Sequence, residues 1–139
     1  MQVRAFEESD TESVVDLWQQ CGLIVPWNDP IKDIQRKTLV GRELFLIGSV
    51  REHTVASIMG GYEGHRGWIN YLAVHPEHQR QGYGKQMVNT LETQLLALGC
   101  PKINLQIRHG NHAVQAFYES LGFADDKAMS MGKRLIPDE

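Results

Sequence analysis

The sequence lacks any apolar run of the roughly 18 residues that a membrane-spanning helix needs. Its first residues contain no apolar core of the kind that a secretory signal peptide carries, so a cytoplasmic location is expected. Cysteine is scarce, and Cys21 and Cys100 form no spaced motif, which favours a reduced pair over a disulfide framework. A surplus of basic charge is also missing, because 14 Lys and Arg residues stand against 17 Asp and Glu residues. A general nucleic-acid-binding protein is therefore disfavoured.

What is present is the composition of an ordinary globular protein. Hydrophobic residues make up 42% of the 139 residues and charged residues 22%, which excludes a disordered tail and a fibrous repeat. The chain has no internal repeat, low-complexity tract or linker-like segment. Its length suits one domain whose core is large enough to be stable without disulfides. We therefore expect a single domain over residues 1–139.

Segments with the periodicity of strands and of helices alternate along the chain. Apolar runs and alternating patterns predict strands at residues 3–6, 44–47, 54–59, 68–74 and 103–107, and one or two more within 123–135. Helical spacing predicts helices within residues 9–22, 29–38, 84–99 and 111–122. Ser9 and Glu12 are expected to form a capping box at the first helix, and Gly60 and Gly61 to end a strand. This order predicts a mixed α/β sheet.

Residues 72–85 carry the strongest chemical signal, because a strand, a loop and a helix start follow one another there. The first turn of a helix has unpaired N–H groups and the positive end of the helix dipole, and both attract phosphate. Gly82 and Gly84 allow the backbone to approach an anion, and Arg80 and Lys85 add positive charge. The dinucleotide-binding and P-loop patterns both fail, because glycines that they require are missing. A solvated strand-to-helix turn is the alternative.

Two motifs carry a resemblance to a known family. The segment Gln79-x-x-Gly82-x-Gly84, after Leu-Ala-Val-His-Pro, resembles motif A of the GNAT (Gcn5-related) N-acetyltransferases. The run N-H-A-V-Q-A-F-Y-E-S-L-G-F at residues 111–123 resembles motif B of that family. The order and spacing of the elements extend the resemblance over nearly the whole chain. Further segments that resemble the bacterial YpeA-type acetyltransferases are 26–30, 60–67, 99–103 and 132–136.

The resemblance implies both a fold and an activity. The fold would be α/β, with a GNAT-like mixed, mostly antiparallel sheet flanked by helices. A V-shaped splay would separate two parallel central strands, around 68–74 and 102–107, where acetyl-CoA enters. The activity would be transfer of an acetyl group from acetyl-CoA to a primary amine by direct nucleophilic attack. The alternative is a non-catalytic acyl-CoA-binding or regulatory module, because motif A alone explains binding.

The resemblance also assigns cofactor contacts and an acid. The backbone of Leu72, Ala73 and Val74 would hold the pantetheine arm, with one N–H group facing the thioester oxyanion. Asn111 would reach the same arm. Tyr118 would lie near the sulfur and protonate the leaving thiolate, the alternative being an aromatic residue of the core. The pyrophosphate would be bound by the N–H groups of Arg80, Gln81, Gly82, Tyr83, Gly84 and Lys85.

The general base and the acceptor site are less defined. Family members that acetylate ribosomal proteins usually carry a glutamate where this sequence has Gln106, which cannot take a proton. Glu63 and His65 are candidate substitute bases in the loop before the cofactor strand, and a solvated hairpin is the alternative. Trp27 would pack on the acceptor and Asp29 would pair with its ammonium, unless Asp29 only caps the next helix.

The expected partners are acetyl-CoA and a small-molecule amine or peptide acceptor. A small amine or amino-acid derivative is slightly favoured over a protein N-terminus. No metal is expected, because the H-x-x-H pairs His75/His78 and His109/His112 lack a third ligand at suitable spacing. Neither a nucleic acid nor a membrane is expected as a partner. The sequence leaves open whether the chain forms a homodimer.

Overall fold

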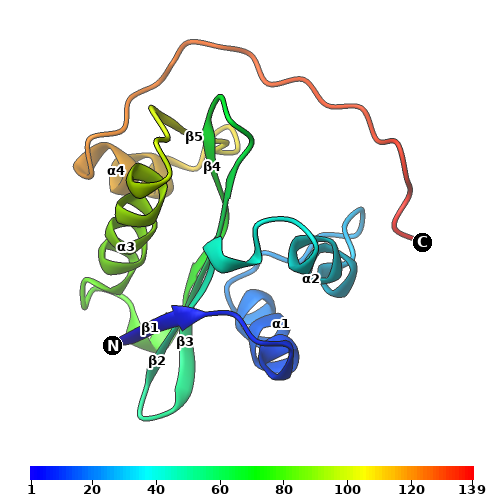
Figure 1. Cartoon of the computed structure of the whole chain (residues 1–139), viewed down its shortest axis with the longest axis vertical. Helices are drawn as coiled ribbons and strands as arrows, with labels where there is room; N and C mark the ends of the chain where they lie inside the picture. Colours follow the sequence, from blue (N-terminus) through cyan, green and yellow to red (C-terminus); the bar gives the residue numbers. More distant parts are fainter. The chain divides into compact units, whose positions relative to one another are not determined.

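The computed structural model describes all 139 residues, and the chain forms two compact units. The main unit comprises Met1–Asn104 together with Asp138–Glu139, and the C-terminal unit comprises Leu105–Pro137. Figure 1 traces the chain from blue at the N-terminus to red at the C-terminus. The main unit holds most of the sheet and three α-helices, whereas the C-terminal unit holds one α-helix.

A five-stranded sheet carries the fold, and its strands are β1 (Gln2–Ala5), β2 (Phe45–Val50), β3 (His53–Tyr62), β4 (Gly67–Val74) and β5 (Ile103–Leu105). The spatial order follows the chain from β1 to β5. The first three pairings are antiparallel, whereas β4 and β5 are parallel. The expected mixed, mostly antiparallel α/β sheet is therefore confirmed.

The last strand, β5, is much shorter than its parallel neighbour. It spans 3 residues against 8 in β4, so the strand expected over 103–107 ends early. The Gly67 N–H donates to the Lys102 carbonyl at 2.8 Å, which places the start of β5 beside the start of β4. Because the two strands run in the same direction, the second half of β4 extends past the end of β5. That part of β4 has no strand beside it on this edge, as the expected splay requires.

Four α-helices agree with the sequence prediction in number and order. They are α1 (Thr11–Gln20), α2 (Pro30–Thr38), α3 (Tyr83–Ala97) and α4 (His112–Ser120). Short 3₁₀ turns occupy Glu8–Asp10, Arg42–Leu44 and Pro76–His78. The glycines expected to follow α1, α3 and α4 all have positive φ, at Gly22, Gly99 and Gly122.

The start of α1 differs from the expected capping box. Ser9 is no cap, because it lies inside the 3₁₀ turn Glu8–Asp10 that precedes the helix. The Glu7 N–H donates to Asp10 Oδ2 at 2.9 Å, so the box forms around Glu7 and Asp10 instead. Arg4 explains the difference, because its guanidinium binds both carboxylate oxygens of Asp10 at 2.7 Å. This pairing lowers the pKa of Asp10.

Helices cover both faces of the sheet in the main unit (Figure 1). Neighbouring residues of a strand lie on opposite faces of the sheet, so Met59 and Gly60 of β3 are covered by different helices. Met59 belongs to the core cluster that includes Trp18 of α1 and Phe45 of β2. Gly60 lies against Leu91 of α3 on the other face. The buried residues of α3 are Met87, Val88, Leu91 and Leu95.

Gly60 and Gly61 do not end the strand, contrary to the sequence prediction. The strand β3 continues through both residues to Tyr62. A Cβ atom added at Gly60 would collide with the methyl groups of Leu91, so glycine is needed for the close approach of α3. Gly60 therefore marks helix-to-sheet packing, and neither glycine breaks the sheet.

The C-terminal tail contains no strand, so the expectation of one or two strands within 123–135 is wrong. Figure 1 draws this segment, orange to red, without an arrow or a helix. A strand is stable only beside other strands, and the regular structure of the C-terminal unit is limited to α4 and the last residue of β5. The tail bonds locally instead, as where the Lys127 N–H donates to Asp125 Oδ1 at 2.7 Å.

The structure can be compared with two expectations from the sequence, which concern the cysteines and the lack of long apolar runs. Cys21 and Cys100 are both free thiols, as expected. None of the helices combines the length and the apolar character that crossing a lipid bilayer demands.

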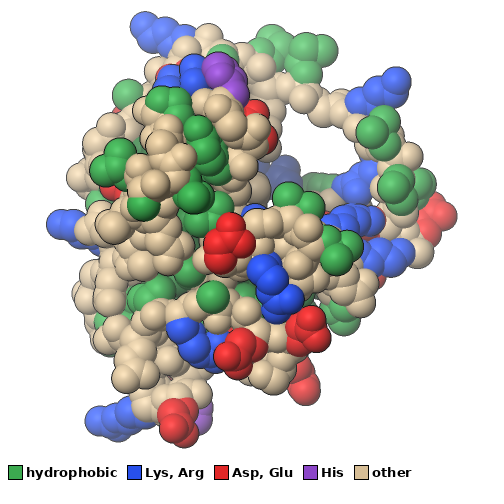
Figure 2. All heavy atoms as spheres, viewed as in Figure 1, with side chains coloured by type: hydrophobic (Ala, Val, Ile, Leu, Met, Phe, Trp, Pro, Cys, Tyr) green, Lys and Arg blue, Asp and Glu red, His purple; other side chains and the backbone are tan.

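On the face that Figure 2 shows, Lys and Arg side chains lie among Asp and Glu side chains over α1 and α2. Charge on this face is mixed and not gathered into a basic stripe.

Candidate active site

The strand β4 contains a β-bulge formed by Tyr71 and Leu72. The register shifts there, so that these two residues lie opposite the single residue Ile58 of β3. Tyr71 has a φ of +50°, a left-handed conformation that is rare for a bulky residue. A bulge changes the direction in which the neighbouring backbone groups point. The expected pantetheine-binding segment, Leu72 to Val74, therefore begins at a bend in the strand.

The peptide that joins Tyr71 to Leu72 has a defined direction. Ser57 Oγ on β3 donates to the Tyr71 carbonyl at 3.1 Å. No peptide bond of the chain is cis, so the carbonyl and the N–H of this planar peptide point in opposite directions. The Leu72 N–H is therefore aimed away from Ser57. An N–H group fixed in this way can donate to an oxygen on which negative charge develops.

The loop from β4 to α3 is shaped by one side-chain bond and by left-handed residues. The Gln79 side chain donates to the Val74 carbonyl at 3.2 Å and so ties the loop to the end of β4. Arg80 and Gly82 have φ values of +63° and +80°. Gly82 adopts this conformation without strain, whereas Arg80 does so at a cost in free energy. Left-handed residues of this kind occur where N–H groups converge on an anion.

The N-terminus of α3 offers unpaired donors. Gly82 is the N-cap, and no side chain caps the helix. The Gln86 N–H donates to the Gly82 carbonyl at 3.0 Å, so the N–H groups of Tyr83, Gly84 and Lys85 precede the first bond of the helix. The first turn holds no acidic side chain. This arrangement suits an anion such as a phosphate.

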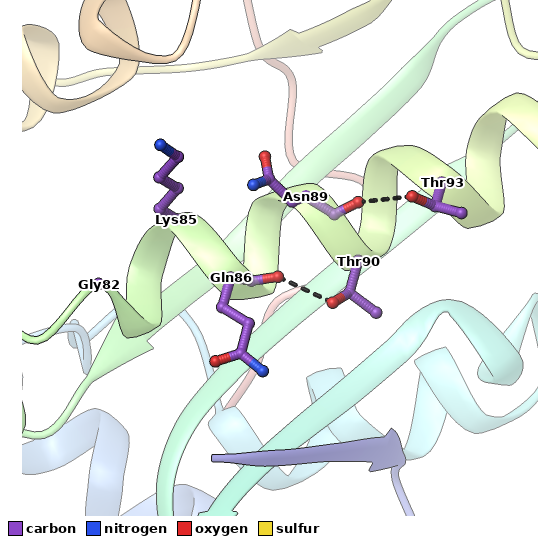
Figure 3. A pocket seen from close by; sticks show the side chains of 6 residues that line it. All are labelled: Gly82, Lys85, Gln86, Asn89, Thr90 and Thr93. Carbon is purple, nitrogen blue, oxygen red and sulfur yellow. Dashed lines mark hydrogen bonds between the residues drawn. The ribbon is translucent and has the colours of Figure 1, made fainter.

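A shallow groove of about 340 Å³ runs along one side of α3 (Figure 3). Thr90 Oγ1 donates to the Gln86 carbonyl at 2.8 Å and Thr93 Oγ1 to the Asn89 carbonyl at 3.0 Å, so both hydroxyls are engaged. Lys85 extends away from the first turn in the same view. The lining residues are Gly82, Lys85, Gln86, Asn89, Thr90 and Thr93. The predicted pantetheine and pyrophosphate residues form one continuous strand, loop and helix start, and of these residues only Gly82 and Lys85 line this groove.

Tyr118 and Asn111 belong to the C-terminal unit. Tyr118 is only 6% exposed, and its ring centroid lies 5.1 Å from that of Phe117 and 5.3 Å from that of Phe123. Burial raises the pKa of Tyr118, so the phenol is protonated at neutral pH. Asn111 caps α4, because its Oδ1 accepts the Val114 N–H at 3.3 Å, and its amide NH₂ is left to donate elsewhere. The roles of both residues toward a cofactor stay predictions.

Glu63 is engaged in its own turn between β3 and β4. Its carboxylate accepts the His65 N–H at 2.6 Å and also the Arg66 N–H. These bonds lower the pKa of Glu63 and make it a weaker base than an ordinary glutamate. His65 is exposed, with its Nδ1 at 3.5 Å from the Arg66 guanidinium. Gln106, at the position of the missing base, donates to the Ser130 hydroxyl. The geometry favours the solvated-hairpin interpretation for Glu63.

Asp29 caps α2, as one of its two interpretations predicted. Its Oδ1 accepts the Ile31 N–H at 2.9 Å and the Lys32 N–H at 3.2 Å. Its Oδ2 accepts none of the hydrogen bonds of the chain, so one oxygen stays free for a cation. Trp27 precedes Asp29 in the same loop and is 53% exposed. A role of this loop in binding an acceptor stays a prediction.

The two histidines of the loop after β4 have a local structural task. His75 Nδ1 accepts the Glu77 N–H at 3.1 Å and shapes the 3₁₀ turn. The rings of His75 and His78 pack edge to face, with centroids 5.7 Å apart. No group of three or more His, Cys, Asp or Glu side chains in the chain is arranged to hold a metal ion.

The sequence analysis missed the residues that hold the bulge. Tyr71 carries the unusual backbone conformation, and its hydroxyl donates to Asp33 Oδ2 at 2.7 Å. Burial, together with this bond, raises the pKa of Tyr71. Ser57 is fully buried within an apolar stretch of β3. A serine in this apolar stretch was the signal in the sequence that could have pointed to the bulge, because a buried hydroxyl needs a hydrogen-bond partner.

Relatives of the chain share its whole length. Acetyltransferase YE1169 of Yersinia enterocolitica serotype O:8 is 45% identical over 139 residues, which cover 100% of this chain and 99% of that protein. The name of this relative gives no subgroup, so the closer resemblance to YpeA-type enzymes stays a prediction.

Solved structures share the fold. The ribosomal-protein-S18-alanine N-acetyltransferase from Escherichia coli matches with a TM-score of 0.74 at 24% identity, over 87% of this chain and 76% of that chain. The aminoglycoside antibiotic 6'-N-acetyltransferase AAC(6')-IG from Acinetobacter haemolyticus matches with a TM-score of 0.74 at 16% identity, over 98% and 100%. Residues 4–123 match the acetyltransferase (GNAT) family as a whole. With a match over that much of its length, the chain belongs to the GNAT family and is an acetyltransferase.

Proposed function

We propose that the enzyme transfers the acetyl group of acetyl-CoA to a primary amine by direct attack of the amine nitrogen on the thioester carbon. The observation that carries this proposal is the continuous backbone site from the β4 bulge to the first turn of α3. A C–N bond forms while the C–S bond breaks. The amine loses one proton and the leaving thiolate gains one, so the products are an N-acetylated amine and CoA.

The main unit supports the binding of acetyl-CoA through its backbone. The pyrophosphate would lie at the first turn of α3, where the N–H groups of Tyr83, Gly84 and Lys85 precede the first bond of the helix. The pantetheine arm would pair with β4 as an added strand does, along the part of β4 that extends past β5. The Leu72 N–H would then donate to the thioester oxygen as its negative charge develops.

Tyr118 would act on the leaving sulfur. Its raised pKa keeps the phenol protonated but also makes it a weaker acid than a thiol of pKa about 8.5. We therefore assign Tyr118 a hydrogen bond to the sulfur during C–S cleavage and not a complete transfer of its proton. The proton lost by the attacking amine would neutralise the thiolate.

The acceptor would attack as a neutral amine, and an acceptor of low pKa would reach that state most readily. Gln106 cannot take a proton, and the pKa of Glu63 is lowered, so neither residue is a strong base. A lysine-like amine of pKa about 10.4 is only about 0.04% neutral at pH 7, whereas an α-amino group of pKa about 7.8 is roughly 14% neutral. The low pKa of an α-amino group suits a protein N-terminus as well as an amino-acid derivative. Trp27 and the free Oδ2 of Asp29 would offer an apolar wall and one negative charge, which slightly favours a small amine or amino-acid derivative.

Amine-dependent release of CoA tests the proposal. The full-length chain is given acetyl-CoA and a panel of amino-acid derivatives, small amines and peptides, and free thiol is followed with a chromogenic disulfide. We expect thiol release above background with at least one amine of low pKa, and a product heavier by one acetyl group. Calorimetric binding of acetyl-CoA with no release across the panel contradicts the transfer reaction. Absence of binding contradicts the donor site itself.

A further inference from the structure

Tyr71 is held in a conformation that its own backbone disfavours. Its left-handed φ of +50° costs free energy for any residue with a Cβ atom, and such strain persists only where the surroundings over-determine it. Residues of three other elements make these contacts: Trp18 of α1, Asp33 of α2 and Ser57 of β3. We call Trp18, Asp33, Ser57 and Tyr71 the bulge clamp.

A buried chain of two hydrogen bonds sets the direction of the Tyr71 carbonyl. Trp18 Nε1 donates to Ser57 Oγ at 2.9 Å, and Ser57 Oγ donates to the Tyr71 carbonyl at 3.1 Å. An indole N–H can only donate, so the serine hydroxyl accepts it and keeps its single hydrogen for the carbonyl. Trp18 and Ser57 are both 0% exposed, so solvent does not compete for these bonds.

The side chain of Tyr71 is fixed at both ends. Its ring stacks on Trp18, with centroids 3.8 Å apart and planes inclined by 8°. Its hydroxyl donates to Asp33 Oδ2 at 2.7 Å, while Arg36 binds the other oxygen of Asp33 at 3.2 Å. Arg36 also binds Asp138 at 2.6 Å, so the Asp33 carboxylate is part of a wider ion-pair network. Tyr71 cannot rotate without breaking contacts to two helices.

We propose that the bulge clamp is a positioning device for acetyl transfer. It fixes the peptide between Tyr71 and Leu72, so that the Leu72 N–H is aimed at the thioester oxygen before the substrate arrives. None of its four side chains needs to touch the reacting atoms, so they are positioning residues. The inference rests on the proposed function, because it requires an acyl group beside Leu72.

The clamp makes a prediction that simple packing does not. If Ser57 served only to fill space, alanine would replace it with little consequence for a bound substrate. If it directs the Tyr71 carbonyl, its removal frees the peptide to rotate and weakens the bond from the Leu72 N–H. Donors preorganised around an oxyanion lose much of their effect when they shift by a fraction of an ångström.

The test uses the infrared carbonyl band of acetyl-CoA labelled with ¹³C at the acetyl carbonyl, bound to the full-length chain. In the wild type we expect a band below that of free acetyl-CoA, because the thioester oxygen accepts a hydrogen bond. In Ser57→Ala the band should move back toward the free position and broaden. The kcat should fall about 10- to 100-fold, and the Kd of CoA should change less than about twofold.

Two further variants separate positioning from stability. Val88→Ala truncates a fully buried side chain of α3 outside the clamp, so it should lower the thermal midpoint without moving the carbonyl band. Tyr71→Phe keeps the ring stack and removes only the bond to Asp33, so it should fold normally, move the carbonyl band part of the way and lower kcat about tenfold. It therefore tests the clamp even if Ser57→Ala fails to fold.

The outcomes distinguish the two proposals. If the wild type does not bind acetyl-CoA, the proposed function fails and the clamp inference fails with it. If the wild type binds and acetylates but Ser57→Ala and Tyr71→Phe keep the wild-type band and kcat, only the clamp inference is overturned. A shifted band in both variants, with Val88→Ala unchanged, supports the clamp.

Discussion

The proposed donor side and the proposed acceptor side of this enzyme are built from different groups. On the donor side, β4 and the start of α3 present backbone N–H groups whose directions follow from a bulge and a helix terminus. On the acceptor side, Asp29 and Glu63 present carboxylates that already bind N–H groups of their own turns. A backbone site is held by the fold itself. A side-chain site competes with the local need to cap a helix or close a turn.

The comparison of the two sides is tested most strongly at Tyr118, because this residue is the one side chain that the proposed donor side needs for the reaction. Tyr118→Phe removes the hydroxyl that would donate to the leaving sulfur and leaves the ring, so kcat should fall by about 10²-fold while the Kd of CoA is unchanged. Steady-state thiol release and calorimetry measure the two quantities. The matched control is Tyr62→Phe, which removes a hydroxyl that bonds only to the Gly64 and Gly99 carbonyls. Equal kcat in the two variants would remove the assigned role of Tyr118.

A pair of glycine variants tests whether the backbone at the start of α3 contributes to CoA binding. Gly82 and Gly22 have similar φ values, +80° and +70°, and neither has a heavy atom within 4 Å of an added Cβ. Alanine at either position should destabilise the protein by about 1 kcal/mol, because a left-handed residue with a Cβ is strained. Only Gly82→Ala should also weaken CoA binding, by about tenfold, since its Cβ would lie where the proposed phosphate site is approached. Calorimetry that finds the same CoA affinity in both variants contradicts the phosphate site.

On the acceptor side, two variants of Asp29 separate capping from charge. Asp29→Ala removes the cap of α2 and should lower the free energy of unfolding by about 1 kcal/mol. Asp29→Asn keeps an oxygen for the cap but removes the charge, so stability should be nearly retained. If Asp29 attracts the acceptor, Asp29→Asn should raise the KM of a cationic amine about threefold. An unchanged KM would leave Asp29 with the cap alone.

The smallest effect is expected at Glu63. Its pKa is lowered in the folded state, so its contribution to stability is present above the unfolded pKa of about 4.3 and is lost as the pH falls through the lower, folded pKa. It is ionised throughout the working range and should impose no limb on the pH profile. In Glu63→Gln, kcat/KM should therefore still rise with pH, and the rise should follow only the pKa of the acceptor amine. A limb near pH 6–7 that disappears in Glu63→Gln would restore Glu63 as the base.

The backbone arrangement of the proposed donor side could be predicted from the sequence because glycine spacing indicates the backbone conformation. Gly82 and Gly84, after an apolar strand, indicate where N–H groups lie exposed at a helix start, and the structure has that arrangement. The bulge could not be predicted in the same way. The φ of Tyr71 depends on Ser57, and Ser57 depends on Trp18, which is 39 residues away in the chain.

The errors of the sequence analysis have the same origin in tertiary contacts. Gly60 resembles a strand breaker locally, and only the position of Leu91 shows that the residue must be small. Ser9 resembles an N-cap, but the guanidinium of Arg4 draws the capping box to Asp10. Local pattern places an element, whereas the exact terminal residues depend on partners from elsewhere in the chain.

Amide NMR of the ¹⁵N-labelled chain during titration with CoA tests the central claim most directly, because it observes the backbone N–H groups themselves. The account predicts the largest shifts at Leu72 to Val74 and at Tyr83 to Lys85. The turn residues Glu63 to Arg66 should barely move until an amine acceptor is added. Shifts that avoid both of the first two segments would contradict a donor site built from the backbone of β4 and α3.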